Sequence, residues 1–391
     1  MLKVNGKMLT WAREDCGLSL EDAALKLGYK DSKQSSAAEK LLHVEKTGEI
    51  SKSAFTKAQT TYRKPVLTYY LNEPPIPTSV GEDFRTPESA SDPRQNNIVK
   101  AILSNVVARQ SMIKELLVTE DEVQHLKFIG SLNMSMEPET AATKIRKLFD
   151  ITLTEYRKGT DYGRSFNYLR KKIEAKGIFV LIKGNLGNYH SDVEVGTFRG
   201  FAISDEIAPF IVINHQEAKS SRAYTLLHEL THVLLGKTGI SADVGEDKVE
   251  RFCDRVASLV LLSDHELKYF SPATELFSQL SKDISDFALA KKVSSTQVAY
   301  RLFQLHKITS SAYRKLCKFY YEQWLSSKKA ERNKDGGGPN QNVIKKSYLG
   351  GIVDFVHRMF ESGAISSTQA GIVLDTHPTR LGNFFNNATP H

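Results

Sequence analysis

The 391-residue sequence has little cysteine and no long apolar run. Its three cysteines, Cys16, Cys253 and Cys317, are far apart, so the sequence predicts neither a disulfide framework nor a metal site built on a cysteine pair. No uncharged apolar stretch approaches the roughly 20 residues that span a bilayer. Charged residues interrupt the amino-terminal stretch where a signal peptide has its apolar core. We therefore expect a cytoplasmic protein that has no membrane partner.

The charge balance excludes few functions. A formal net charge of +8 permits contact with nucleic acid, but 45 acidic residues dilute the positive field and no long basic run is present. With 40% hydrophobic and 25% charged residues, the composition is that of an ordinary globular protein. The length suggests several domains.

Changes of periodicity divide the chain into five segments. Short amphipathic helices are expected over 1–71, and a stretch rich in Pro, Ser and acidic residues predicts a linker over 72–96. The segment 97–270 begins with helical periodicity and continues with three runs, GIFVLIKG, VGTFRGFAI and PFIVIN, that predict strands of one small sheet. A helical, helix-turn-helix-like subdomain is expected over 271–333, from the passage DFALAKKVSSTQVAYRLFQLHKI, and a helical C-terminal region over 334–391. The predicted fold class is α+β and mostly helical.

The clearest chemical signal is the sequence LLHELTHVLLG, which lies on a predicted helix. His228 and His232 are four residues apart, so both imidazoles project from one face and can bind the same metal ion. Such a pair favours Zn²⁺. Glu229 lies beside them as a candidate general base that takes a proton from water. The HExxH pattern can also arise by chance on a helix, so the prediction needs a third ligand.

The next predicted helix offers that ligand in VERFCDRVASLVLL. Glu250 and Asp254 share one face, and two His with one Glu is a known ligand set of zinc hydrolases, which makes Glu250 the candidate third ligand. Asp254 is expected to accept a hydrogen bond from His228 and so to fix the tautomer of the imidazole. Glu246 and Asp247 compete as ligands, although their place at the helix start suits them to the helix dipole. An exposed acidic face is the other explanation for Glu250 and Asp254.

The sequence LLHELTHVLLG followed by ERFCDRVASLVLL resembles the ImmA/IrrE family of metallopeptidases, over about residues 149–324. The resemblance implies a zincin-like peptidase core with a small sheet and an HExxH helix. It implies that His228, His232 and Glu250 are the zinc ligands and that Glu229 is the catalytic residue. This sequence departs from the common family pattern at two places. It has Cys253-Asp254 where many members have Ala-Asn, and Tyr224 where many have Phe.

Two features of the expected active site stay open. An oxyanion donor is required, and four side chains qualify by type: Tyr224, His215, His190 and Arg222. The run PFIVIN is expected to supply the sheet edge along which a peptide substrate lies by strand addition.

The N-terminal segment resembles helix-turn-helix domains of the XRE type, through LSLEDAALKLG and AAEKLLHVEKTGEIS. The resemblance implies that DNA is a partner. An insert, YKDSKQSSAAEK, lengthens the region between the two predicted helices. The candidate DNA-binding residues are Lys30, Lys33, Gln34 and Ser35. Protein binding by this module is the open alternative.

Three functions follow from these features. The resemblance implies a zinc-dependent endopeptidase that cleaves a cytoplasmic transcriptional repressor or a similar regulatory protein, recruited by its N-terminal module to DNA or to that repressor. The alternatives are a DNA-binding transcriptional regulator whose peptidase fold senses a ligand or serves as a scaffold, and an antitoxin-like binding protein. The intact HExxH motif favours the peptidase, because a scaffold does not require Glu229.

Overall fold

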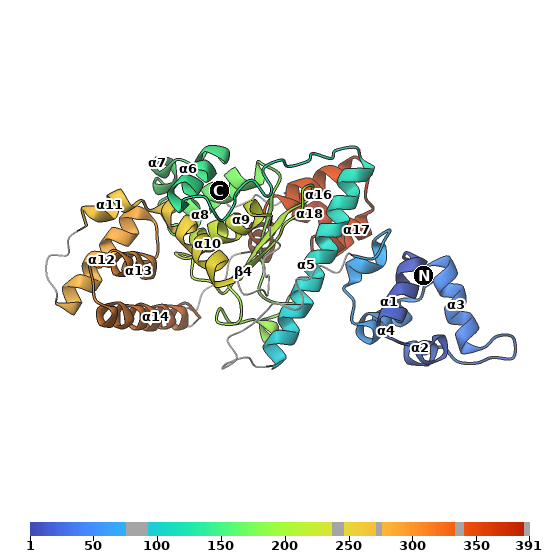
Figure 1. Cartoon of the computed structure of the whole chain (residues 1–391). Helices are drawn as coiled ribbons and strands as arrows, with labels where there is room; N and C mark the ends of the chain where they lie inside the picture. Colours follow the sequence, from blue (N-terminus) through green and yellow to red (C-terminus); the bar gives the residue numbers. More distant parts are fainter. Residues whose placement is uncertain (76–92, 237–245, 271–275, 333–339, 387–391) are drawn as a thin grey trace.

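The protein is mostly helical and contains a small sheet, which confirms the predicted α+β class. The computed structural model describes residues 1–75, 93–236, 246–270, 276–332 and 340–386. In Figure 1 an N-terminal helical bundle lies at one end, the sheet lies near the middle, and α12 to α14 lie at the opposite end. In the part of the chain that is described, no helix has both the length and the apolar character needed to cross a membrane.

The N-terminal bundle has an apolar core of its own, which includes Leu41 and Phe55. Its elements are β1 (Leu2–Lys3), α1 (Gly6–Asp15), α2 (Leu20–Leu27), α3 (Ala37–Thr47), β2 (Glu49–Ile50), α4 (Lys52–Tyr62) and the 3-10 helix η1 (Val66–Tyr70). Ser36 begins α3 with a capping box, in which its hydroxyl accepts from the backbone of Glu39 and the Glu39 side chain accepts in return.

The remaining elements surround a three-stranded sheet. Before and within the sheet come α5 (Pro93–Thr119), α6 (Pro138–Leu148), α7 (Leu153–Arg157), α8 (Tyr162–Glu174), β3 (Phe179–Ile182), the 3-10 helix η3 (Tyr189–Ser191), β4 (Gly200–Ile203) and β5 (Phe210–Ile213). After it come α9 (Arg222–Leu234), α10 (Glu246–Leu261), α11 (Asp264–Lys268), α12 (Phe277–Lys291), α13 (Ser295–Gln304) and α14 (Ser310–Arg332). The C-terminal elements are α15 (Gln341–Leu349), α16 (Ile352–Glu361), α17 (Ser367–Val373), the 3-10 helix η4 (Pro378–Arg380) and α18 (Leu381–Asn386).

The three predicted strands form this sheet in the order β3-β5-β4. The central strand β5 runs parallel to β3 and antiparallel to β4, with Gly200 opposite Ile213. The expectation that PFIVIN supplies the substrate edge is therefore wrong. This strand is hydrophobic on both faces because it is the central strand, and the two edge strands are β3 and β4.

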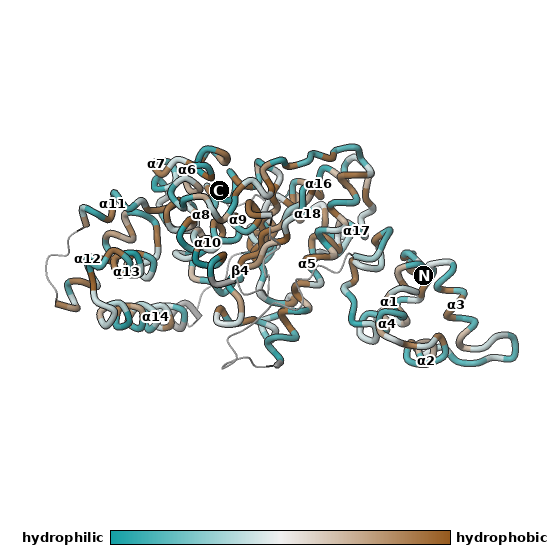
Figure 2. Tube along the Cα trace, viewed as in Figure 1, coloured by the Kyte–Doolittle hydropathy of each residue, from teal (hydrophilic) through white to brown (hydrophobic). Residues whose placement is uncertain are grey.

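Both faces of the sheet are covered. Alternate residues of β5 enter different cores: Ile211 and Ile213 join the core that contains α9 and α10, whereas Phe210 and Val212 join the core that contains α5 and α16. Figure 2 shows the apolar strands between these helices. The sheet thus provides a rigid floor on which α9 is held.

Two predicted linkers lie largely outside the described residues. The structure describes nothing for 76–92, and α5 begins at Pro93, so residues 93–96 are helical where the sequence predicts a linker. The run KDGGGPN lies outside the described residues except for its last position.

Candidate metal centre

Two packed helices carry the predicted ligands. On α9, ten of thirteen residues are buried, because the helix lies between the sheet and α10. The helix ends at Leu234, and Gly236 follows it in the left-handed conformation with φ of 69°. The apolar positions around the HExxH motif hold α9 against the sheet, so its histidines have a fixed orientation toward α10.

Three side chains from α9 and α10, the candidate metal ligands of the sequence analysis, lie close together. His228, His232 and Glu250 place one nitrogen or oxygen atom each within 4.8 Å of the others. The two Nε2 atoms are 3.1 Å apart, and the Glu250 oxygens lie 3.1 Å from Nε2 of His228 and 3.2 Å from Nε2 of His232. Ligand atoms of a tetrahedral zinc site with bonds of about 2.0–2.1 Å are about 3.3 Å apart. These donors therefore fit a single Zn²⁺ ion in type, number and spacing.

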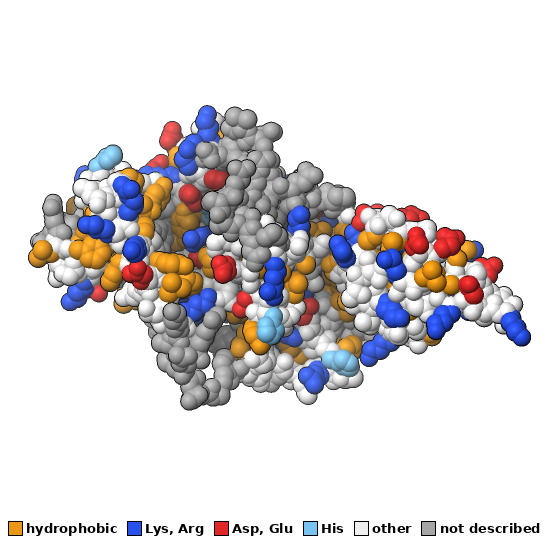
Figure 3. Space-filling model, turned by 90° about the horizontal axis from the view of Figure 1, so that it is seen from below, with side chains coloured by type: hydrophobic (Ala, Val, Ile, Leu, Met, Phe, Trp, Pro, Cys, Tyr) orange, Lys and Arg blue, Asp and Glu red, His pale blue; other side chains and the backbone are white. Residues whose placement is uncertain are grey.

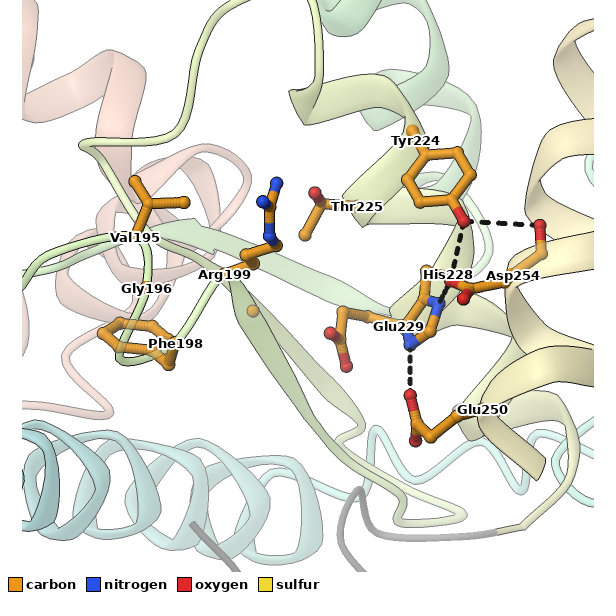
Figure 4. Close-up of a pocket in the computed structure, with 11 residues that line it drawn as sticks. Val195, Gly196, Phe198, Arg199, Tyr224, Thr225, His228, Glu229, Glu250 and Asp254 are labelled. Atoms are coloured by element: carbon orange, nitrogen blue, oxygen red, sulfur yellow. Dashed lines mark hydrogen bonds and ion pairs between the residues drawn. The ribbon is translucent and has the colours of Figure 1, made fainter. Parts of the chain in front are cut away.

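Asp254 supports the cluster from one turn further along α10. Its Oδ1 lies 2.9 Å from Nδ1 of His228 and accepts a hydrogen bond of 2.6 Å from the hydroxyl of Tyr224 (Figure 4). A carboxylate on the second imidazole nitrogen keeps Nε2 available as a metal ligand. Tyr224 thus acts on Asp254, and its hydroxyl is committed there in this structure.

The electrostatics of the cluster are those of cation ligands. Burial opposes charge on His228, but the carboxylates of Asp254 and Glu250 outweigh it and raise the pKa of His228 to about 10. Burial also acts against the charged form of Glu250, yet hydrogen bonds with the two histidines lower the pKa of its carboxyl well below the usual range. A bound cation replaces the proton shared in this cluster, so metal binding must release protons.

Glu229 occupies a different environment from the ligand carboxylate. Its residue is only 6% exposed, and burial raises the pKa of the Glu229 carboxyl while the neighbouring imidazoles oppose that shift. A carboxyl with a raised pKa is suited to take and return a proton near neutral pH. Gly200 makes room for it: a Cβ atom at that position would lie 2.9 Å from Oε1 of Glu229.

A cleft of about 410 Å³ opens beside these residues. Its lining is Val195, Gly196, Phe198, Arg199, Gly200, Tyr224, Thr225, His228, Glu229, Glu250 and Asp254. Figure 4 shows Arg199 and Phe198 on the side opposite Asp254. No local pattern in the sequence marks the residues between β3 and β4 as part of the site, because the return of this segment to the cleft depends on the tertiary fold.

Other sequence candidates lie elsewhere or are engaged. Arg222 donates hydrogen bonds to the backbone carbonyls of His215 and Glu217. His215 is outside the cleft lining, and its Nε2 lies 3.2 Å from Oδ1 of Asp192. His190 is also outside that lining. The side chains of Glu246 and Asp247, the competing ligands, are outside what the structure describes.

The candidate DNA-binding residues lie on a loop. Lys30, Lys33, Gln34 and Ser35 fall between α2 and α3 and not on a helix, and all but Ser35 are exposed. On the face seen in Figure 3, both basic and acidic side chains cover the N-terminal bundle.

Comparison with known families concerns the part of the chain that holds the cleft. Residues 174–303 match the family model of the IrrE N-terminal-like domain, a peptidase domain of the M78 type. The match covers about a third of the chain and includes the sheet, α9 and α10. No curated protein and no solved structure gave a match. The family match supports the ImmA/IrrE resemblance and a metallopeptidase role for this domain.

Proposed function

We propose that the protein is a zinc-dependent endopeptidase that cleaves a cytoplasmic transcriptional repressor or a similar regulatory protein. The observation that carries this proposal is the convergence of His228, His232 and Glu250 beside the buried Glu229, within a domain that matches a peptidase family. A protein that only binds a partner does not need a buried carboxylate beside His228, His232 and Glu250, because burial of a carboxylate costs stability.

The roles of the residues follow from their positions. Zn²⁺ bound by His228, His232 and Glu250 supplies Lewis acidity, which lowers the pKa of water and polarises a carbonyl. Glu229 takes the proton of the attacking water on its carboxylate and gives it to the leaving amine. Asp254 holds the imidazole of His228 in the ligand tautomer through Nδ1.

The sheet suggests how a peptide is held. The edge strand β4 begins at Gly200, which lies against Glu229, so a peptide that adds to β4 passes the catalytic carboxylate. One side of β4 is hydrogen-bonded to β5, so a peptide would pair with the opposite side of β4. An extended segment of a regulatory protein fits this mode, because a folded helix cannot supply the main-chain hydrogen bonds.

The test of the proposal is the Glu229→Gln variant, assayed with purified candidate repressors and with metal analysis. We expect zinc content equal to that of the original chain, because Glu229 is not among the three ligands, and a loss of cleavage by about 10²- to 10⁴-fold. A His232→Ala variant is the matched control and should lose zinc and cleavage together. Unchanged cleavage by Glu229→Gln would contradict the proposed mechanism.

The N-terminal bundle is proposed to recruit the peptidase, either to DNA or to the repressor. A gel shift of the full chain at low and high salt distinguishes the two, because contacts with phosphates weaken steeply as salt rises. Substitution of Lys30 and Lys33 by Gln should weaken a DNA complex. If the chain binds no DNA even at low salt, the bundle is left with a protein partner.

A further inference from the structure

The cleft has one strongly cationic side chain besides its histidines. Among the lining residues that the structure describes, Arg199 is the only lysine or arginine. The carboxylates of Glu250 and Asp254 lie on the opposite wall and are paired with His228. Arg199 therefore carries its charge on the wall opposite the proposed metal ligands.

The backbone of Arg199 is held in place while its side chain is open to the cleft. Arg199 immediately precedes β4, and its carbonyl accepts a hydrogen bond of 2.8 Å from the backbone of Asn214, which continues the pairing of β4 with β5. Its side chain is 66% exposed. The backbone of Arg199 is thus fixed next to the edge strand β4, and its exposed guanidinium can contact a peptide bound along that strand.

The protein partner of Arg199 leaves donors free for a ligand. Only Nη1 of Arg199 contacts Oε1 of Glu217, at 3.2 Å, and that carboxylate is 2% exposed. The Arg222 guanidinium is also close enough to Glu217 to stabilise its charge. One buried carboxylate therefore serves two guanidinium groups, and burial raises the pKa of Glu217. Glu217 contacts only one nitrogen of the Arg199 guanidinium, so its other N–H groups can bind a ligand.

We infer that Arg199 forms a subsite for an acidic side chain, so that the peptidase prefers substrates with Asp or Glu close to the cleaved bond. The inference rests on the proposed peptidase function and adds the chemistry of the substrate. A guanidinium binds a carboxylate through two parallel hydrogen bonds, which fix position as well as charge. Because the guanidinium reaches only one residue of an extended substrate, a single substrate position carries the preference.

The first experiment uses the zinc-loaded full chain and a library of unstructured peptides, with cleavage sites read by mass spectrometry. We expect Asp and Glu to be enriched at one position within about two residues of the cut, since extended residues are spaced about 3.3 Å apart. A matched pair of peptides with Glu or Gln at that position then gives kinetic constants. The Glu peptide should have a kcat/KM about tenfold higher, mainly through KM.

Charge substitution separates specificity from catalysis. In Arg199→Met the Glu to Gln ratio should fall to about one, and in Arg199→Glu a peptide with Lys at the position should become preferred. Lys219→Met, an exposed residue outside the cleft lining, is the control for lost charge and should keep the original ratio. Equal losses in kcat on both peptides in Arg199→Met would overturn the inference and assign Arg199 to the reaction itself.

If cleavage is too slow for kinetic constants, peptide affinity can be measured instead. The Glu229→Gln variant should bind the Glu peptide about tenfold more tightly than the Gln peptide in calorimetry, and added Arg199→Met should remove the difference. If the zinc-loaded chain neither cuts nor binds any peptide or candidate repressor, the proposed function is wrong. If it cuts peptides without an acidic preference, only the Arg199 subsite fails.

Discussion

Asp254 links the metal ligands to a hydrogen bond that the sequence did not predict. Its carboxylate accepts from the Tyr224 hydroxyl and lies against Nδ1 of His228. Tyr224 and Asp254 are two of the three positions at which the sequence departs from the ImmA/IrrE pattern that it resembles, and their side chains contact each other. For a metal bound as proposed, the negative charge of Asp254 would make His228 a stronger ligand, and Tyr224 would restrict the orientation of the carboxylate.

Replacement of Asp254 by Ala tests this support. We expect zinc affinity to fall by about 10- to 100-fold, because the imidazole of His228 loses the group that fixes its tautomer. Competition with a chromophoric chelator measures the affinity. Tyr224→Phe is the matched control, since it removes the hydroxyl and leaves the carboxylate, and it should change affinity by much less. Equal affinities in Asp254→Ala and the original chain would show that Asp254 does not support the ligand.

Gly200 controls the space available to the Glu229 carboxylate. A Cβ atom there would lie 2.9 Å from Oε1 of Glu229, from Cγ2 of Thr225 and from the carbonyl of Val212. Because the carbonyl belongs to the paired strand and cannot yield, we expect Gly200→Ala to cost about 1–3 kcal/mol of unfolding free energy. The displaced Glu229 should lower cleavage while zinc is retained.

Chemical denaturation and metal analysis measure the two effects of Gly200→Ala. Gly196→Ala is the control from the same cleft, because a Cβ atom at that position meets nothing within 4 Å and should leave the unfolding free energy unchanged. A Gly200→Ala protein with normal stability and normal cleavage would show that the strand or the helix can shift to accept the methyl group.

At the scale of elements, the sequence predicted what local periodicity determines. The helix with His228 and the strands of the sheet follow from spacing and β-branched runs, and the structure contains them. The sequence does not predict that β5 is central and that β3 and β4 are the edges, because strand order depends on long-range pairing. The approach of Arg199 to the cleft was also missed, since no local pattern records which loop closes on a site.

The Glu266 carboxylate on α11 joins three helices, because it accepts hydrogen bonds from Arg157 of α7 and Lys291 of α12. Burial would raise the pKa of Glu266, but hydrogen bonds from Arg157 and Lys291 outweigh it and lower that pKa to about 2 from the usual 4.5. A pKa lowered by folding stabilises the folded state above the unfolded pKa. That stability must be lost as the pH falls from about 4.5 to about 2.

The pH dependence can be isolated with Glu266→Gln. We expect the original chain to exceed the variant by about 2 kcal/mol in unfolding free energy at pH 7, which is less than the full shift implies because the carboxylate is partly solvated. The difference should shrink as the pH approaches 2. Denaturation at a series of pH values gives this curve, with Glu322→Gln, an exposed carboxylate on α14, as the control. A difference that does not change with pH would exclude the linkage.

At the scale of the whole molecule, the C-terminal helices share a core with the sheet. Leu181 and Val212 of the sheet lie in the same apolar cluster as Val356 and Met359 of α16. The sequence predicts a separate region over 334–391 because a glycine-rich run precedes it. Local composition marks where a chain can bend, but it does not record what the following helices pack against.

Met359→Ala tests whether these helices and the metal domain unfold together. Met359 is 1% exposed, so its truncation should cost about 2–5 kcal/mol. Because the cluster continues into the sheet beneath α9, we expect one unfolding transition, with the loss of zinc binding at the same lowered denaturant midpoint as the loss of helical signal. Glu361→Ala, an exposed position on the same helix, should shift neither midpoint. If zinc binding keeps its original midpoint while part of the helical signal is lost earlier, the C-terminal helices are an independent unit and the metal domain does not depend on them.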